Sequence, residues 1–425
     1  MKPATIALHA GYDGDPATNA ATTPIYQTTS YTFNDTQHGA DLFDLKVPGN
    51  IYSRIMNPTN AVLEARVAAL EGGIGALAVA SGMAAIRYAI EAIAEVGSNI
   101  VSTSQLYGGT YNLFAHTFPR QGIETRFAKA DDFDKVAALI DGNTKALFCE
   151  SIGNPAGNVV DIARWAEIAH AAGVPLIVDN TVATPALCRP FEHGADIVVH
   201  SLTKYIGGHG TTIGGAIVDS GKFDWAAHPE RFAIMNTPDP SYHGVVYTEA
   251  MGPAAFIGRC RVVPLRNTGA ALSPNSAFLL MQGLETLDLR MQRHCHNAKK
   301  VAKYLRKHPQ VSWVNYAGLK DSPYRETCKK ICGGKASGIL SFGIEGGRDA
   351  GARFIDALQL ILRLVNIGDA KSLACHPAST THRQLNPAEL ASAGVSEDMV
   401  RISVGIEHVD DIIADIEQAL AASQG

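Results

Sequence analysis

Short apolar runs alternate with helical segments through most of the first 275 residues, and this rhythm constrains the fold more than any other feature. The apolar runs lie at 76–80, 99–102, 145–149, 175–179, 196–199 and 214–218. Segments with helical periodicity, such as 83–94 and 162–172, separate most of them. This alternation predicts an α/β domain built on a mainly parallel sheet. In such domains ligands bind at the carboxyl ends of the strands, so chemistry is expected there.

The chain is predicted to have three parts: an arm at 1–60, a large domain at 61–275 and a smaller α+β domain at 276–425. The arm is rich in Thr, Asn, Gly and Tyr and precedes the first good helical pattern, so we expect it to contact a neighbouring subunit. The first helix of the large domain is expected after Pro58. Its expected N-cap is Thr59 or Asn60, and its expected end is Gly72–Gly73.

Two later segments depart from the alternating pattern. Residues 220–275 are rich in Pro, Gly and aromatic residues, and we expect loops and short helices that close over the site. One long helix is expected from Ser273 to about Lys307. The smaller domain is then predicted from strand-like runs at 311–314, 338–344 and 399–404 and helical segments at 349–361 and 409–421.

Composition and charge exclude several classes of protein. With 46% hydrophobic and 18% charged residues, the 425-residue chain has the composition of a globular enzyme. Its net charge of −5 gives no general attraction to nucleic acid or to an anionic membrane. No apolar run reaches the roughly 18 residues needed to cross a bilayer, and the N-terminus lacks the apolar core of a signal peptide. The cytoplasm is therefore the expected compartment.

The seven cysteines show no pairing rhythm, which argues against a disulfide framework. Cys328 and Cys332 lie four residues apart, and Cys295 lies between His294 and His296. Neither group has a second pair of ligands at zinc spacing. We therefore expect no metal site.

Lys204 is the candidate nucleophile, because it follows the run at 196–199 and stands beside the hydroxyls of Ser201 and Thr203. An amine is nucleophilic only when it is partly desolvated and held in place, and a glycine-rich loop at a strand end provides both conditions. A lone lysine is more often a solvated surface residue. Partners at the same edge of the sheet decide between these interpretations.

An anion site and an acid are predicted at other strand ends. Ser81, Gly82 and Met83 join a strand to a helix, whose N–H groups and dipole favour an anion; a simple capped helix is the alternative. Asp179 ends the run at 175–179, where a carboxylate needs a cation such as a protonated pyridine nitrogen. A metal ligand or a core hydrogen-bonding group is the alternative for Asp179.

Three further residues are candidate site residues: two follow predicted strands, and the third carries a guanidinium that can bind a carboxylate. Tyr107 follows the strand that ends near Ser102, where its ring could cover a planar cofactor and its hydroxyl could move protons. Asn154 offers an amide after the strand at 145–149. Arg401 offers a guanidinium that matches a carboxylate with two hydrogen bonds. The respective alternatives are a half-buried loop tyrosine, an ordinary turn and a structural ion pair.

These motifs, in their order and spacing, resemble the pyridoxal-phosphate enzymes of cysteine and methionine metabolism. The resemblance rests on Ser81-Gly-Met83, Asp179-Asn-Thr181, Ser201-Leu-Thr-Lys204, Tyr52-Ser-Arg54, Asn57-Pro-Thr59 and His376-Pro-Ala-Ser-Thr-Thr-His382. It spans roughly residues 5–420. It implies the aspartate-aminotransferase-like fold (fold type I) and a homotetramer, a dimer of dimers with shared active sites.

The resemblance also implies a role for each candidate residue around pyridoxal 5′-phosphate. Lys204 would form the Schiff base, Asp179 would hold the pyridine nitrogen, and Tyr107 would stack on the ring and assist catalysis. The phosphate would be held by the segment Ser81, Gly82 and Met83, by Ser201 and Thr203, and by Tyr52 and Arg54 of a neighbouring subunit. Asn154 would contact the 3′-oxygen of the ring, and Arg401 with Ser372 would bind the substrate's α-carboxylate.

Within this family the chain is most similar to the O-acetylhomoserine sulfhydrylases. The similar segments are Phe33-Asn-Asp-Thr36, Glu150-Ser-Ile-Gly-Asn-Pro155, Asn366-Ile-Gly-Asp-Ala-Lys371 and the insertion at 220–270. The implied reaction joins sulfide to O-acetyl-L-homoserine and gives L-homocysteine and acetate. Ile152 departs from the pattern of many members, which have proline there. Gly109 stands where methionine γ-lyases usually carry a cysteine, which disfavours that activity.

Other functions stay open at this point. Methionine γ-lyase and cystathionine γ-synthase activities belong to the same family. A dinucleotide-dependent oxidoreductase also uses an α/β sheet, but the first strand–helix turn here lacks Gly-x-Gly-x-x-Gly. A non-catalytic scaffold has no need of a lysine, an aspartate and an arginine at strand ends.

Overall fold

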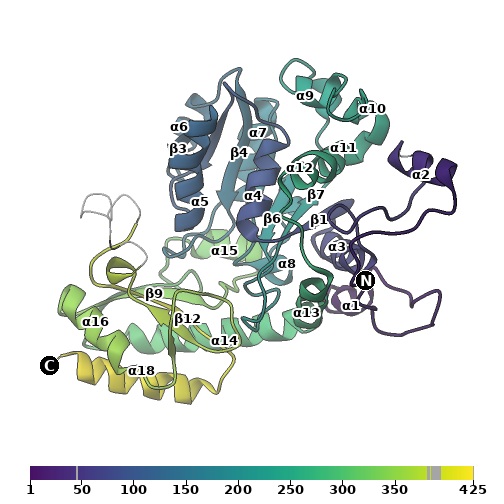
Figure 1. Ribbon diagram of the computed structural model, residues 1–425. Coiled ribbons are helices and arrows are strands. Elements are labelled where there is room, and N and C mark those ends of the chain that lie inside the picture. The colour runs from purple at the N-terminus through teal and green to yellow at the C-terminus, as the bar shows by residue number, and fades with distance from the viewer. Residues whose placement is uncertain (45, 381–382, 384–393, 425) are drawn as a thin grey trace.

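Two β-sheets organise the protein, and the computed structural model describes residues 1–44, 46–380, 383 and 394–424 (Figure 1). The larger sheet has seven strands in the order β1-β7-β6-β5-β4-β2-β3. Its strands are β1 (Gly75–Val79), β2 (Asn99–Thr103), β3 (Glu124–Ala128), β4 (Thr144–Glu150), β5 (Leu176–Asp179), β6 (Ile197–Ser201) and β7 (Gly215–Asp219). Neighbouring strands are parallel except at β7, which runs antiparallel to both β1 and β6.

The apolar pattern predicts every strand of this sheet except β3. This strand lies at the edge of the sheet beside β2, and four of its five residues are not fully buried. Its sequence, Glu-Thr-Arg-Phe-Ala, therefore lacks the continuous apolar run that is typical of a strand covered on both faces.

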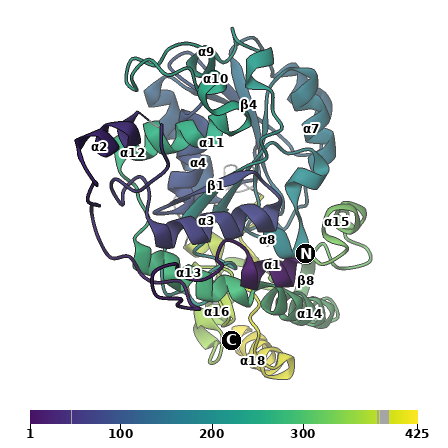
Figure 2. The same ribbon diagram turned by 90° about the vertical axis from the view of Figure 1, so that its right-hand side faces the viewer.

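Alternate residues of the strands pack into two separate cores, one on each face of the sheet. In β1, Leu77 and Val79 belong to one core, and Ala76 and Ala78 belong to the other. α4 (Gly82–Glu91) and α11 (Ala255–Cys260) cover the first face, whereas α3 (Pro58–Glu71) and α7 (Ile162–Ala171) cover the second (Figures 1 and 2). The other α-helices described in the first 190 residues are α1 (Pro3–His9), α2 (Thr36–Phe43), α5 (Gly108–Asn112), α6 (Phe133–Ala138) and α8 (Thr184–Leu187).

Asn57, not Thr59 or Asn60, is the N-cap of α3. The Asn57 side chain accepts the Thr59 N–H at 3.0 Å and so satisfies a free donor of the first turn. The two expected caps lie inside the helix, where the Thr59 hydroxyl donates to the Pro24 carbonyl and the Asn60 amide donates to the Leu272 carbonyl. The expected end is confirmed, since Gly72 adopts the left-handed conformation (φ +82°).

The expectation that residues 220–275 close over the site of their own chain is wrong. Their helices, α9 (Ala233–Asn236), α10 (Tyr247–Met251), α11 and α12 (Arg266–Thr268), lie on the α4 side of the large sheet (Figure 1). The Trp225 ring stacks on Phe256 at 5.5 Å, and Phe232 packs edge-on against Trp225. The aromatic residues of this segment thus build the first core, and they do not line the cavity described below.

The smaller, C-terminal domain contains a five-stranded sheet in the order β10-β11-β12-β9-β8. Its strands are β8 (Val311–Asn315), β9 (Ile339–Ile344), β10 (Leu362–Arg363), β11 (Leu373–Cys375) and β12 (Met399–Ser403). Its α-helices within the described ranges are α14 (Leu287–Leu305), α15 (Arg325–Cys332), α16 (Gly347–Ala357) and α18 (Val409–Ser423), and α18 packs against both α14 and α16 at the lower left of Figure 1. No helix in the described ranges is both long enough and apolar enough to cross a membrane.

The long helix expected from Ser273 to Lys307 is two helices, α13 (Pro274–Glu285) and α14, which meet at Thr286. The Gly283 carbonyl accepts the Thr286 hydroxyl at 3.2 Å and the Arg290 guanidinium at 2.6 Å, so side chains replace the helical bond there. α13 packs on α3 and α14 packs on β8 and β9. The boundary at 275/276 stays a prediction.

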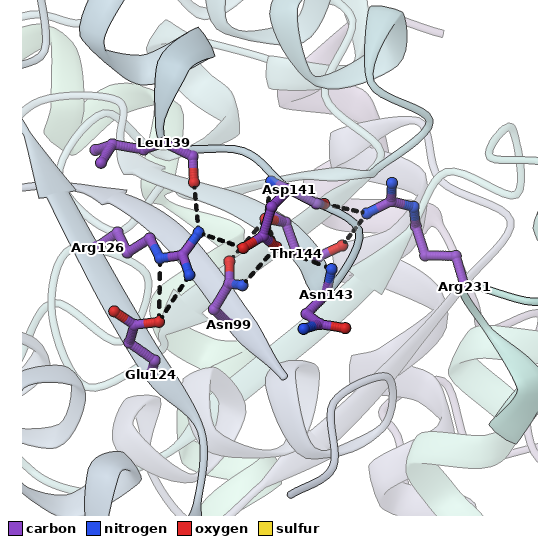
Figure 3. A network of polar contacts seen from close by, with 8 residues as sticks. All are labelled: Asn99, Glu124, Arg126, Leu139, Asp141, Asn143, Thr144 and Arg231. Carbon is purple, nitrogen blue, oxygen red and sulfur yellow. Dashed lines mark hydrogen bonds and ion pairs between the residues drawn. The ribbon is translucent and has the colours of Figure 1, made fainter. Parts of the chain in front are cut away.

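A polar network joins the amino-terminal ends of β2, β3 and β4, opposite the carboxyl ends of these parallel strands (Figure 3). The Asp141 carboxylate accepts hydrogen bonds from the Asn99 amide at 2.8 Å and from Arg126 at 2.7 Å. It also accepts from the Asn143 N–H at 2.8 Å. These donors, led by Asn99, hold the pKa of Asp141 well below its usual range.

We expect Asp141→Ala to lower the free energy of unfolding by about 1–2 kcal/mol, because the carboxylate is partly exposed and its bonds are screened. The folded state lowers the pKa of Asp141, so this contribution is complete above pH about 4, begins to decline below it, and is lost as the pH falls through the lowered pKa of the folded state. Urea unfolding at pH 7 and at pH 3 measures both effects. Glu230→Ala, which removes an exposed carboxylate, is the control, and an equal loss in the two variants would contradict this interpretation.

Candidate active site

The carboxyl ends of β4, β5 and β6 meet at one edge of the large sheet, where they border a cavity of about 210 Å³. The structure brings nine of the predicted site residues to its wall: Ser81, Gly82, Met83, Tyr107, Asn154, Asp179, Ser201, Thr203 and Lys204. Ile152, Ile213 and Ile367 add apolar wall, and Ile367 comes from the C-terminal domain. A larger, more open hollow of about 700 Å³ lies around Trp313, and its described wall carries no lysine or arginine.

The start of α4 forms one end of the cavity. The Ser81 hydroxyl caps the helix by accepting the Ala84 N–H at 3.1 Å. The N–H groups of Gly82 and Met83 lie in the first turn, where a helix offers them no acceptor of its own. A Cβ atom at Gly82 would lie 2.6 Å from the Cβ of Ser201, so only glycine allows the two segments to approach this closely. The result is a set of backbone and hydroxyl donors suited to an anion.

Lys204 reaches the cavity from the loop that follows β6. Its Nζ donates a hydrogen bond to Oδ1 of Asn366 in the C-terminal domain. Burial, assisted by the charge of Arg401, lowers the pKa of Lys204 to about 8. A substantial fraction of the amine is therefore neutral near pH 8, as a nucleophile or a proton acceptor requires.

Asp179 and Glu150 end neighbouring strands and lie opposite each other in the parallel register. Oδ1 of Asp179 accepts the Thr181 N–H at 2.9 Å, but burial raises the pKa of Asp179. Burial and the charge of Asp179 raise the pKa of Glu150 well above its usual range. Two buried carboxyl groups this close favour a single negative charge, and a cation in the cavity would stabilise that charge.

Arg401 lies on β12 and is 5% exposed. Its guanidinium donates to Oδ1 of Asn154 at 3.2 Å and to the backbone oxygen of Asn366 at 3.1 Å. The Nε atom of Arg401 is buried and has no partner among the described residues. The guanidinium thus retains donor capacity beside Lys204, which suits a carboxylate.

Like Arg401, which contacts Asn154, three more predicted site residues lie outside the cavity wall. Tyr52 is exposed on the N-terminal arm, and the Arg54 guanidinium lies 5.1 Å from the centre of its ring. The Ser372 hydroxyl donates to Glu407 at 2.9 Å and accepts the Gly405 N–H at 2.8 Å. The roles of these residues stay predictions. Within the motif at 376–382, Thr381 and His382 lie outside the described residues.

The sequence reasoning missed several residues that touch or support the site. Asn366 and Glu150 were noted only as parts of segments similar to one branch of the family. Beneath the cavity, Nε2 of His200 lies 2.6 Å from Oε1 of Glu71, and both side chains are fully buried. The Asn180 amide donates to the same oxygen at 2.9 Å. Because these partners are far apart in sequence, no local pattern indicates them.

The cavity fits pyridoxal 5′-phosphate, which the sequence resemblance implies. The start of α4 supplies N–H donors for the phosphate, and the close approach of Gly82 to Ser201 leaves no room for a side chain between them. Lys204 supplies a buried amine for the aldehyde carbon. Asp179 supplies a carboxylate that needs a cation, which a protonated pyridine nitrogen provides. No group of three or more metal-binding side chains occurs among the residues that could be searched.

Comparisons with known proteins agree with this fit. The family model for Cys/Met metabolism PLP-dependent enzymes, which use pyridoxal phosphate, matches residues 4–421. The chain is 55% identical to the homocysteine synthase of Schizosaccharomyces pombe, over 98% of this chain and 97% of that protein. It is 51% identical to the O-acetyl-L-homoserine sulfhydrylase of Leptospira meyeri, over 99% of this chain and 97% of that protein.

A solved structure shares the fold. It is described as an O-acetylhomoserine (thiol)-lyase of Campylobacter jejuni, and it contains an N′-pyridoxyl-lysine-5′-monophosphate. The two structures superpose with a TM-score of 0.96 at 44% identity, and the match covers 99% of this chain and 100% of that one. The chain therefore belongs to the family of Cys/Met metabolism PLP-dependent enzymes, and its cofactor is pyridoxal phosphate.

Proposed function

We propose that the protein is an O-acetylhomoserine sulfhydrylase, a transferase that converts O-acetyl-L-homoserine and sulfide into L-homocysteine and acetate. In this γ-substitution the C–O bond at the substrate's γ-carbon breaks, acetate leaves, and a C–S bond forms there. The observation that carries the proposal is that Lys204 and Asp179 line one cavity, while Arg401 bonds to Asn154 of the same wall and lies close to Lys204. The relatives named homocysteine synthase and O-acetyl-L-homoserine sulfhydrylase support the choice of substrates.

Each of these residues has a distinct role in the proposed reaction. The bound cofactor supplies a cationic ring that withdraws electrons from the substrate's α-carbon. Lys204 would hold the cofactor through its Nζ until the substrate's amino group takes its place, and the freed Nζ would then move protons at the α- and β-carbons. Asp179 keeps the ring nitrogen protonated, and Arg401 holds the α-carboxylate. Tyr107 covers the ring and is a further candidate for proton transfer at the leaving group.

A γ-lyase and a cystathionine γ-synthase are the alternatives within the family. A specific observation disfavours the lyase: a Cβ atom at Gly109 would lie 2.6 Å from Cε1 of Tyr107. A cysteine at this position, as methionine γ-lyases usually carry, would therefore require the Tyr107 ring to move. The family match leaves no support for a dinucleotide-dependent oxidoreductase.

One assay separates these activities. The purified holoenzyme is offered O-acetyl-, O-succinyl- and O-phospho-L-homoserine, each with sulfide, methanethiol or L-cysteine, and the products are identified by mass spectrometry. We expect homocysteine from the acetyl ester and sulfide to form fastest. A parallel reaction with L-methionine alone tests the lyase. Faster cystathionine formation with L-cysteine, or faster cleavage of methionine, would contradict the proposed function.

We further propose that the enzyme is a dimer of dimers in which Tyr52 and Arg54 complete the phosphate site of a neighbouring subunit. Their place on an arm, outside the cavity of their own chain, supports this proposal. The proposed location is the cytoplasm, supported by seven cysteines that are buried and unpaired. The net charge of −5 supports small-molecule substrates rather than nucleic acid or membrane surfaces as partners.

Arg54→Ala is expected to weaken retention of pyridoxal phosphate, and mixing it with Lys204→Ala is expected to restore activity. In a mixed dimer one of the two sites contains neither substitution. If half of the dimers are mixed, about a quarter of the sites are intact, so about a quarter of wild-type activity should return. Activity of the re-associated mixture measures this, with mass spectrometry of the intact oligomer as proof of mixing. Mixed oligomers without restored activity would contradict site sharing.

A further inference from the structure

Two carboxyl groups lie side by side in the cavity, and the proposed reaction uses only one of them. Glu150 ends β4 and is paired in register with Asp179, which ends β5. Both side chains line the cavity, and Glu150 is only 5% exposed. A buried carboxyl group without a cationic partner is costly unless its oxygens accept hydrogen bonds or it is neutral. The contacts of Glu150 therefore indicate its role.

Oε1 of Glu150 accepts the backbone N–H of Tyr107 at 2.6 Å, across 43 residues of sequence. Tyr107 needs such an anchor, because it stands just before the five-residue helix α5 and is 48% exposed. Gly108 and Gly109, which follow it, add no side chains that could hold it. The backbone N–H of Asn154 also favours the ionised form of Glu150. The contact with Tyr107 thus joins the end of β4 to the start of α5.

The charge state of the pair fits this role. Burial and the charge of Asp179 raise the pKa of Glu150 well above its usual range, although the N–H groups of Tyr107 and Asn154 oppose the rise. Thr181 opposes the rise at Asp179, and Lys204 lies on the same cavity wall with the charge of Arg401 close to it. These shifts favour a single negative charge on the pair, and burial and the charge of Asp179 both drive Glu150 toward its neutral form. The carbonyl oxygen of a neutral carboxyl group still accepts an N–H.

We propose that Glu150 is a positioning residue that fixes Tyr107 at the mouth of the cavity by accepting its backbone N–H. This inference rests on the proposed function, because it takes Tyr107 to cover the cofactor ring. Under this proposal, position 150 must supply an oxygen that accepts the Tyr107 N–H, and that oxygen need not carry a negative charge. Glutamine should therefore replace Glu150, whereas an apolar side chain of the same length should not.

The test compares Glu150→Gln, which keeps an acceptor oxygen, with Glu150→Met, which removes it at similar size. Each is made in the wild-type and Tyr107→Ala backgrounds, and Glu95→Met serves as the exposed control. Three readouts are taken on the holoenzyme: hydrogen exchange of the peptide covering 104–112, visible circular dichroism of bound pyridoxal phosphate, and kcat/KM. The first two do not depend on which acyl ester is the substrate, so a wrong substrate assignment leaves them informative.

We expect Glu150→Met to speed exchange in 104–112 by about tenfold or more and to lower kcat/KM by about 10- to 100-fold. It should also change the visible circular dichroism, because the ring of Tyr107 moves relative to the cofactor. Glu150→Gln should stay within about threefold of wild type in exchange and in kcat/KM. In the Tyr107→Ala background, Glu150→Met should have little further effect on kcat/KM, since Glu150 acts through Tyr107.

Three results would overturn the proposal. One is unchanged exchange in the Glu150→Met enzyme. Another is full additivity of Glu150→Met and Tyr107→Ala. The third is a Glu150→Gln enzyme as impaired as Glu150→Met, which would assign the role to the charge. If Glu150→Met does not fold, Glu150→Asp, which withdraws the carboxyl group by one methylene, replaces it in the same experiment.

Discussion

Lys204→Ala is expected to lower kcat by at least about 10³-fold. The substitution removes the only lysine on the cavity wall as described, and with it both the covalent anchor of the cofactor and the group that moves protons. Because the amine is buried and bonded to Asn366, its loss also leaves that amide without its cationic donor. Steady-state kinetics and the visible spectrum of the loaded variant measure these effects.

The Lys204→Arg variant distinguishes a chemical role of this lysine from a structural one. Arginine keeps a positive charge beside Asn366 but does not lose a proton at neutral pH, so it cannot act as a nucleophile or base. Both variants should therefore be inactive, and both should melt within a few degrees of the wild-type apoenzyme. Recovery of activity in Lys204→Arg would assign a structural role to this lysine instead.

Asp179→Asn is expected to lower kcat by about 10²–10⁴-fold while the variant still binds pyridoxal phosphate. The amide has the same shape and can still accept the Thr181 N–H, so the fold should be unchanged. It carries no charge, however, and cannot keep the ring nitrogen protonated. The expected signature is therefore a loss in kcat that is much larger than the change in cofactor Kd.

A cofactor titration of the apoenzyme, combined with kinetics at saturating cofactor, separates the two quantities for Asp179→Asn. An equal loss in kcat and in cofactor affinity would assign Asp179 to binding alone. Activity near that of wild type would contradict the assignment of Asp179 to the ring nitrogen.

The α/β fold was predictable because six strands of the large sheet contain short apolar runs, most of them separated by helices. The remaining features of the fold depend on tertiary packing, which a local sequence pattern does not show. β3 is a polar edge strand, and the break at Thr286 depends on an arginine one turn further along the chain. The segment at 220–275 looked like a lid by composition, but its aromatic residues pack against the large sheet.

The site was predictable where local motifs mark strand ends, as at Ser81, Asp179 and Lys204. The family and the cofactor that the motifs implied are confirmed. Residues that act through long-range contacts escaped detection: Asn366 reaches Lys204 from the other domain, and Glu150 reaches Tyr107 from the neighbouring strand. A single chain also leaves the roles of Tyr52 and Arg54 as predictions, since they require a second subunit.

Reduction of the holoenzyme with borohydride, followed by peptide mapping, tests whether Lys204 carries the cofactor. Reduction fixes the cofactor to the lysine that holds it, and the visible band should disappear. We predict one labelled peptide, with the pyridoxyl group on Lys204, and no label in the Lys204→Ala enzyme. A pyridoxyl group on any other lysine of the native enzyme would contradict the account.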